Sequence, residues 1–436
     1  MKRSRWFSVV MKRTAALMLL GGSGISGVAV ELSGWDAEGA LTWKGALAPG
    51  IATVETAPSA SGPWTPVRNV FSLSSTGSVA LARESATQFR RVRSDLMEPG
   101  AAGFRTLVGA YGLLETIAGN GAGQEDPVSY WSEFYEGVPG SWAALSRPHY
   151  AMADRTGRVF IADKNSHSVL RVDLDGTIHT HAGSHEGGFE GEGPLAATQM
   201  KLRFPNALWV RGDGTVYVLD TGNGRVRRVD LEGTMQTLFV ATSNGGELEG
   251  GRTLWVNDTE TLAYFGAETR VRSWTPSAGL RTVASGFSEI GNLCVEANGN
   301  LIVADRGAHY VYRVTPAGVR SILAGNGKTS GGGHGSPGRS TGLYGVRGVW
   351  PMPTGGFLLL THDGCQLWYL DAGGTIWRLL NGDGGRTHAG DGLPFYSAEP
   401  RISEGRSVTL DPQGNILVCE SDWGYVRRIR FERLPD

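Results

Sequence analysis

The sequence predicts an all-β protein, a six-bladed β-propeller of four-stranded blades that follows a small β-sandwich-like domain. Three observations carry this prediction. After residue 147 one pattern recurs six times, and residues 204–238 hold its clearest copy. The 65 glycines and 19 prolines indicate many turns. The last copy lacks one strand, and a matching strand stands alone ahead of the first copy.

Each copy contains four short apolar runs, which we call strands A to D from the inside of the propeller outwards. In the clearest copy they are NALWV, VYVLD, RVRRV and TMQTL, separated by glycine-containing turns. The final copy, residues 406–431, has only A, B and C. Residues 113–121, LLETIAGNG, form a D-type strand with no A, B or C before it. Pairing the two ends closes the ring and leaves no exposed sheet edge.

The motif residues Pro205, Gly214, VYVLDTGNGRVRRVD at 216–230 and Gly233 resemble the NHL-repeat six-bladed propeller family. The resemblance covers about residues 113–431 and implies a closed ring of blades. It implies no particular reaction, because this family is defined by its fold.

Ahead of the repeats, residues 30–95 contain several short apolar runs with Pro and Gly turns, which predict the small β-sandwich. The stretch ATVETAPSASGPWTPV resembles an immunoglobulin- or fibronectin-like module. Residues 96–110 are interpreted as a linker, and residues 111–436 as the propeller.

The N-terminus predicts export. Basic residues up to Arg13 precede an apolar run, Ala15–Leu20, and Gly27-Val28-Ala29 suits a signal peptidase. We therefore expect a signal peptide at 1–29 and a periplasmic, cell-surface or extracellular protein. A membrane anchor is the less favoured alternative because glycines interrupt the run. No transmembrane span is expected in the mature chain, and a formal net charge of −1 disfavours nucleic acid as a partner.

One face of the propeller should carry function. Strands alternate in direction, so the B–C turns and the D–A connections emerge on the same face. Four D–A connections are long, and long loops on a rigid scaffold concentrate binding residues. We call this the long-loop face. The connections are 120–147, 184–204, 325–345 and 382–404.

The start of strand A supplies a ring of equivalent positions beside the central channel, which we call the channel-mouth ring. Its two arginines suit a carboxylate or phosphate ligand. Alternatively, they pair with neighbouring acids such as Glu404. His362 lies on the same face and joins the predicted ligand-binding set. The ring residues are His149, Asn206, Gly251, Gly291, Arg347 and Arg406.

Arg147-Pro148-His149 resembles a zinc-binding Pro-His motif of the peptidyl-hydroxyglycine amidating lyase, an NHL-like propeller. A catalytic zinc usually needs three protein ligands, and the other five ring positions hold no histidine. No catalytic residue is therefore predicted.

A second ring, the acid ring, stands at the end of strand B. We interpret its carboxyl groups as acceptors of backbone N–H groups that fix the B–C turn. A calcium site is the alternative, although no EF-hand-like spacing occurs. The ring comprises Asp163, Asp220, Asp305 and Glu420, with Phe265 and Thr361 at the two remaining positions.

Aromatic residues form two further groups. Trp131 and Tyr135 lie in the first long connection, where they could stack on a sugar or a partner's side chain, or fold down as a cap over the channel. Trp209, Trp255 and Trp350 share one position in strand A and are interpreted as wedges between neighbouring blades.

The sequence thus predicts a secreted, non-enzymatic binding propeller whose long-loop face engages a protein, peptide or glycan. The alternative is a metal-dependent hydrolase or lyase of the lactonase or amidating-lyase kind, working in the channel. No cofactor is predicted under the first hypothesis, whereas Ca or Zn would serve the second.

Overall fold

The computed structural model describes residues 28–35, 39–81, 89–123, 126–381 and 387–435. Most of the predicted signal peptide, residues 1–27, lies outside this range, while Val28–Ala29 forms the short strand β1. Within the described residues, no helix has the length and apolar character needed to cross a bilayer.

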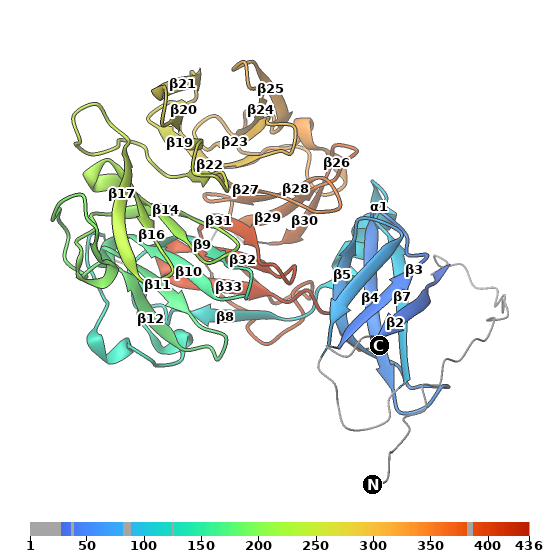
Figure 1. Ribbon diagram of the computed structural model, residues 1–436. Helices are drawn as coiled ribbons and strands as arrows, with labels where there is room; N and C mark the ends of the chain where they lie inside the picture. The colour runs from blue at the N-terminus through green and yellow to red at the C-terminus, as the bar shows by residue number, and fades with distance from the viewer. Residues whose placement is uncertain (1–27, 36–38, 82–88, 124–125, 382–386, 436) are drawn as a thin grey trace, which may run out of the picture.

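The N-terminal part consists of two packed sheets (Figure 1). Their core contains Leu41, Trp43, Val54 and Val92, each almost fully buried. One sheet has the order β1-β7-β4-β5, with β7 at Phe89–Leu96, β4 at Gly50–Ala57 and β5 at Thr65–Ser72. The other has the order β2-β3-β6, at Glu31–Trp35, Ala40–Lys44 and Thr76–Ala80.

The segment expected to be a linker holds a helix, α1, at Ala101–Ala110. Phe104 and Leu107 on this helix are buried in one core together with Ile51 of the sandwich and Phe431 near the C-terminus. The side chain of Asn69 donates a hydrogen bond of 2.7 Å to the carbonyl of Ala110. The helix therefore packs the sandwich against the rest of the chain.

Residues 114–429 form six antiparallel sheets in the described part of the chain, each ordered from an inner to an outer strand (Figure 1). Second strands such as β15 are fully buried because sheets stack on both of their faces, so they read as continuous apolar runs. We number the sheets in chain order. Sheet 1 is β9 (Pro148–Ala153), β10 (Val159–Asp163), β11 (Ser168–Val172) and β12 (Ile178–Ala182); sheet 2 is β14 (Pro205–Val210), β15 (Val216–Asp220), β16 (Arg225–Val229) and β17 (Thr234–Val240); sheet 3 is β18 (Leu254–Val256), β19 (Ala263–Ala267), β20 (Arg270–Thr275) and β21 (Gly279–Ser285); sheet 4 is β22 (Ile290–Val295), β23 (Leu301–Asp305), β24 (Tyr310–Val314) and β25 (Arg320–Ala324); sheet 5 is β27 (Val346–Pro351), β28 (Phe357–Thr361), β29 (Gln366–Leu370) and β30 (Thr375–Leu380); sheet 6 is β31 (Gly405–Leu410), β32 (Ile416–Glu420), β33 (Tyr425–Ile429) and β8 (Leu114–Ala118).

The ring closes through the two ends of this region. Strand β8, teal in Figure 1, is the outer strand of sheet 6 beside the red β33, with Leu114 opposite Ile429 and Ala118 opposite Val426. The inner strands contact one another in the closed cycle β9, β14, β18, β22, β27, β31 and back to β9. The predicted pairing of the first strand with the last copy is therefore confirmed. The two-residue strands β13 (Leu195–Ala196) and β26 (Ser336–Pro337) add to the outer edges of sheets 2 and 5.

Candidate ligand site at the mouth of the central channel

The channel-mouth ring residues that carry a side chain lie at β-bulges in the inner strands. In sheet 1 Asp163 pairs with Pro148 and Ala162 with Tyr150, so His149 is the extra residue. The same register shift leaves Asn206, Arg347 and Arg406 unpaired in the inner strands of sheets 2, 5 and 6. A bulge bends the strand and re-aims one side chain. In this ring the re-aimed side chains are polar.

At the ring's remaining positions, Gly251 and Gly291 carry no side chain. Gly251 precedes the inner strand of sheet 3, and its carbonyl accepts a hydrogen bond of 3.0 Å from Asn206. Gly291 lies so close to Arg347 that a Cβ would come within 2.5 Å of the Arg347 carbonyl oxygen.

Arg406 has a carboxylate partner, which is Asp422. Arg406 Nη2 lies 2.8 Å from Asp422 Oδ1, and Arg147 Nη2 lies 2.6 Å from the same oxygen. Glu404, the acid expected to pair with the arginines, hydrogen-bonds the Asp422 carboxyl group. Burial would raise the pKa of Asp422, but the Glu404 hydrogen bond and the Arg406 charge hold it well below its usual value. Two carboxyl groups that hydrogen-bond each other hold a proton between them, so this pair carries a single negative charge.

Arg347 differs from Arg406. Its side chain is only 2% exposed, and its guanidinium donates no hydrogen bond to any residue that the structure describes. Burial lowers its pKa well below the usual value, and the charges of Arg406, Arg252 and Arg306 lower it further, while Glu289 opposes the shift. Glu289 is already shared, because Arg252 lies 2.8 Å and Arg306 3.1 Å from it.

His149 is 6% exposed, and neither of its ring nitrogens has a hydrogen-bond partner in the structure. Burial, followed by the charges of Arg406 and Arg347, holds its pKa well below the usual value. His149 is therefore neutral, with one ring nitrogen able to donate a hydrogen bond and the other able to accept one. Asn206 Oδ1 is likewise buried and unpartnered.

His362 approaches the same cluster from the B–C turn of sheet 5. Its Nε2 lies 3.9 Å from Glu404 Oε2, and its Nδ1 has no hydrogen-bond partner. Burial and the nearby charges of Arg347 and Arg406 lower its pKa to about 2, so it too is neutral.

These groups include one set of side chains with the composition of a metal site. Ligand atoms of His362, Glu404 and Asp422 lie within 4.8 Å of one another. The Asp422 carboxylate, however, already accepts from Arg147 and Arg406. A divalent ion held by this set would compete with these two arginines for the Asp422 carboxylate.

Other histidines of the long-loop face support the backbone. His167 and His309 end the B–C turns of sheets 1 and 4 with left-handed backbone. Their Nδ1 atoms accept hydrogen bonds from the N–H groups of Phe204 and Gly345, at 3.2 and 3.0 Å. These two side chains therefore hold the next long connection in place.

The carboxyl groups of the acid ring, at the end of strand B, also hold the connections that lead into strand A. Asp163 accepts from Ser146 N, Asp220 from Arg203 N, Asp305 from Ser288 N and Glu420 from Ser403 N. The donors lie at the ends of the segments leading into strand A, rather than in the B–C turn where they were expected. At the two other positions, Thr361 Oγ1 accepts from Gln366 N within the turn, and Phe265 is an apolar core residue.

Two members of the acid ring, Asp220 and Glu420, also form buried ion pairs with arginines. Arg227 Nε lies 3.1 Å from Asp220 Oδ2, and Arg427 Nη1 lies 3.0 Å from Glu420 Oε1, with all four side chains fully buried. Leu170 stands at the corresponding position of sheet 1, so Asp163 has no such cation. Burial accordingly raises the pKa of Asp163 to about 7.

The aromatic residues lie elsewhere. Trp131 stacks on His185 with ring centroids 5.0 Å apart, and Tyr135 packs edge-on against Trp131. Their loop hydrogen-bonds the outer strand β12 through Gly137 N and Ile178 O. Both side chains thus stand at the outer edge of sheet 1, and they do not form the cap over the channel that was one of the two expectations.

The strand A tryptophans require a correction. Trp209 lies 6.1 Å from both Trp255 and Trp350, measured between ring centroids. Trp209 and Trp255 belong to the neighbouring sheets 2 and 3, as expected. Trp350 belongs to sheet 5, which is not a neighbour of sheet 2, so its ring meets Trp209 across the axis. The three rings occupy the end of strand A opposite the channel-mouth ring, and the channel is therefore narrowed by indole rings at its far end.

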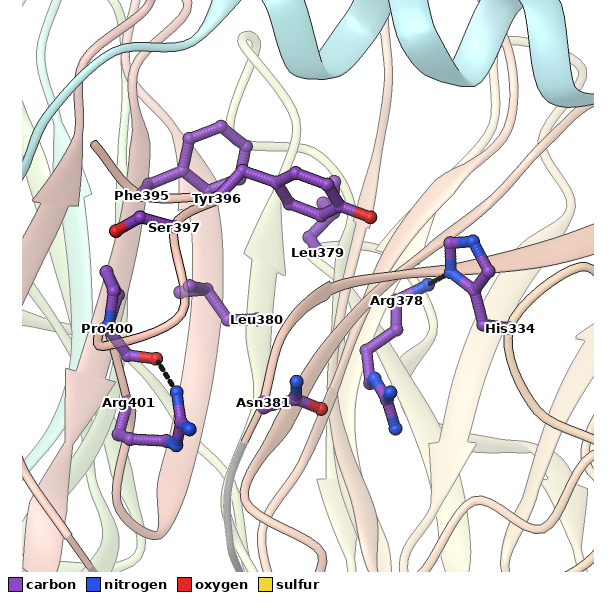
Figure 2. Close-up of a pocket in the computed structure, with 10 residues that line it drawn as sticks. All are labelled: His334, Arg378, Leu379, Leu380, Asn381, Phe395, Tyr396, Ser397, Pro400 and Arg401. Carbon is purple, nitrogen blue, oxygen red and sulfur yellow. Dashed lines mark hydrogen bonds between the residues drawn. The ribbon is translucent and has the colours of Figure 1, made fainter.

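A separate hollow lies between strand β30 of sheet 5 and residues 395–401 of the connection that precedes β31 (Figure 2). Its polar groups have partners: Arg378 N donates to His334 Nδ1, and Arg401 Nη1 donates to the carbonyl of Pro400 (Figure 2). This hollow therefore shows less unmet hydrogen-bonding capacity than the channel mouth.

Sequence reasoning found the ring but missed several charged residues around it. Asp422 lies within the B–C turn of sheet 6, where Asp363 holds the equivalent position in sheet 5. Arg147 ends a long connection, and because the lengths of these connections differ between copies, a repeat alignment does not identify their charged residues. The missed residues are Asp126, Arg147, Lys164, Arg252, Glu289, Arg306, Asp363 and Asp422.

Comparisons with known proteins support the fold. No protein-family model and no curated protein matches the chain. Solved structures do match: a protein of unknown function from Bacteroides thetaiotaomicron has 13% identity over 92% of this chain and 98% of its own, with a TM-score of 0.56. An auxiliary nutrient binding protein from the same organism has 10% identity, 93% and 98% coverage and a TM-score of 0.54. One from Bacteroides ovatus has 13% identity, 90% and 94% coverage and a TM-score of 0.55. The chain has the fold of these propeller-type proteins.

Proposed function

We propose that this protein is an exported, non-enzymatic binding protein that captures its ligand on the long-loop face, at the channel mouth. The observation that carries the proposal is the set of buried polar atoms without hydrogen-bond partners, above all both ring nitrogens of His149, which lie beside the buried cation Arg347. Buried polar groups are normally hydrogen-bonded, and leaving them unpaired costs stability. A site that keeps them unpaired is prepared for a ligand.

Two further observations support this proposal. Long connections surround the mouth, which suits a protein, peptide or glycan ligand. Two of the structural neighbours are named auxiliary nutrient binding proteins. That likeness is one of fold, so the choice of ligand rests on the site.

The proposal is tested by screening the full chain against glycan, peptide and small-metabolite panels, with direct titration of each hit. Binding should weaken in His362→Ala, on the long-loop face, and persist in Glu232→Ala, whose exposed side chain lies in the C–D turn of sheet 2 on the opposite face. Hits that lose affinity only in the second variant would contradict the proposal.

The metal-dependent hydrolase or lyase is kept as the second candidate because His362, Glu404 and Asp422 could provide three ligands. Metal analysis of the purified protein separates the two. Stoichiometric Zn or Ca that is lost in His362→Ala, together with turnover of a lactone or peptide-derived substrate, would favour the enzyme.

Export is tested separately, by N-terminal sequencing of the mature protein. Cleavage after Ala29 is expected, and it would remove strand β1, which contributes two residue pairs to the sandwich. Retention of the complete N-terminus in a cytoplasmic fraction would contradict export.

A further inference from the structure

We propose that Arg347, Arg406 and His149 form a binding site for one oxyanion group of the ligand, a carboxylate or a phosphate. This inference rests on the proposed function and specifies the chemistry of the ligand that the channel mouth would accept.

The first argument is charge. A guanidinium remains protonated in proteins, and an isolated buried charge costs several kcal/mol unless a counter-charge accompanies it. Arg347 has that burial, and no described carboxylate bonds to it. Among its near neighbours, Arg252 and Arg306 share Glu289, and Arg306 also holds Asp363 at 3.0 Å. The carboxylates of this region are thus already engaged by other arginines.

The second argument is the state of the other carboxyl groups. Asp422 neutralises Arg406 and Arg147 together, since one oxygen accepts from both. Glu404 shares a hydrogen bond with Asp422 and so brings no second negative charge. Around the mouth, the three arginines Arg147, Arg406 and Arg347 therefore face two carboxylate charges, those of Asp422 and Asp126, and Lys164 also shares Asp126.

The third argument is hydrogen-bond geometry. His149, on the neighbouring inner strand β9, offers a neutral N–H with no protein acceptor. Oxyanions accept several hydrogen bonds, and an arginine donates two in parallel to a carboxylate or phosphate. The bulge that re-aims His149, Arg347 and Arg406 delivers these donors to one place from sheets 1, 5 and 6.

The arrangement also sets the direction from which a ligand reaches the site. The Trp209, Trp255 and Trp350 rings narrow the far end of the channel. A ligand therefore enters from the long-loop face with its charged group first, while the rest of the molecule stays among the long connections.

The experiment uses the full chain and measures thermal shift and calorimetric binding of sodium phosphate and sodium acetate, each against sodium chloride at equal ionic strength. Either oxyanion is expected to stabilise the protein more than chloride does. In Arg347→Met the affinity should fall about tenfold or more, the effect of losing a charge-assisted hydrogen bond. In Arg228→Met, which removes an arginine at a distance from the mouth, the response should remain.

The outcomes are distinct. A response to acetate alone assigns a carboxylate, a response to phosphate alone assigns a phosphate, and a response to both supports the oxyanion site as stated. No response to either, or a response that survives in Arg347→Met, overturns the inference. Arg347→Lys checks folding, since it keeps the charge and should retain part of the affinity. A neutral ligand found on the long-loop face would leave the proposed function standing while this inference fails.

Discussion

The channel-mouth ring and the acid ring are both built from polar residues repeated around the propeller, but they differ in how far their hydrogen bonds are satisfied. Every carboxyl group of the acid ring accepts a backbone N–H, and Asp220 and Glu420 add a buried arginine. In the channel-mouth ring, neither ring nitrogen of His149 has a hydrogen-bond partner, and the Arg347 guanidinium bonds no carboxylate among the residues that the structure describes. A buried polar side chain whose hydrogen bonds are all made within the protein indicates a structural role. A buried polar side chain without a partner indicates a site for a ligand.

The largest effect is expected where the acid ring is broken. Arg227→Met leaves Asp220 buried without its cation, and removing one partner of a buried pair costs about 3–5 kcal/mol. Urea unfolding should show this loss. The matched control is Arg228→Met on the same strand, because Arg228 is paired with Glu260 near the surface, and it should cost about 1 kcal/mol or less. If the two substitutions lowered the free energy of unfolding equally, the acid ring would have no special structural role.

Asp163 tests the member of the acid ring that has no cation. Its carboxyl group keeps a proton up to about pH 7 in the folded protein, against 3.8 for an ordinary aspartate. The folded state then binds more protons than the unfolded state between these values, so this contribution to stability is present below about pH 4 and lost as the pH rises towards 7. In Asp163→Asn the urea midpoint should depend less on pH over this window. An unchanged pH slope would show that Asp163 is ionised in the folded protein.

Arg347→Met should act in the opposite direction to Arg227→Met. Replacing a buried, unpaired cation by an apolar side chain of similar length removes a desolvation penalty, and the expected gain is about 1–3 kcal/mol in the free energy of unfolding. Arg406→Met is the control, since it deprives Asp422 of a partner and should bring no gain. A loss of stability in Arg347→Met would place Arg347 in the same structural class as the acid ring.

The smallest effect concerns His388, which hydrogen-bonds Glu420 at 3.2 Å. Burial would lower its pKa, but hydrogen bonds to Asp391 and Glu420 raise it above its usual value. The stabilisation is therefore fully present below the unfolded value of 6.5 and is lost as the pH rises through the folded pKa. His388→Gln should cost about 1 kcal/mol near pH 6 and less above pH 8, measured by urea unfolding. A cost that does not change with pH would contradict this.

The sequence predicted the repeating strands because each copy has an apolar run of strand length between glycine turns, and local chemistry decides such elements. It predicted the ring closure from one missing strand and one spare strand. It did not predict α1, since a ten-residue amphipathic segment after Pro99-Gly100 resembles a linker until its apolar side meets a partner. It also failed to predict that Trp350 meets Trp209, because spacing along the chain cannot show which rings meet across an axis.

For the site, the sequence by itself determined which residues stand at equivalent positions around the channel, because a repeat aligns one residue per copy. Only the tertiary structure decided which of two similar arginines has a carboxylate: Asp422 reaches Arg406 and Arg147 from a turn, while Glu289 serves Arg252 and Arg306 and leaves Arg347 without one. The physical reason is that ion pairing depends on distances of a few ångströms between segments far apart in the chain, and those distances exist only once the ring has closed.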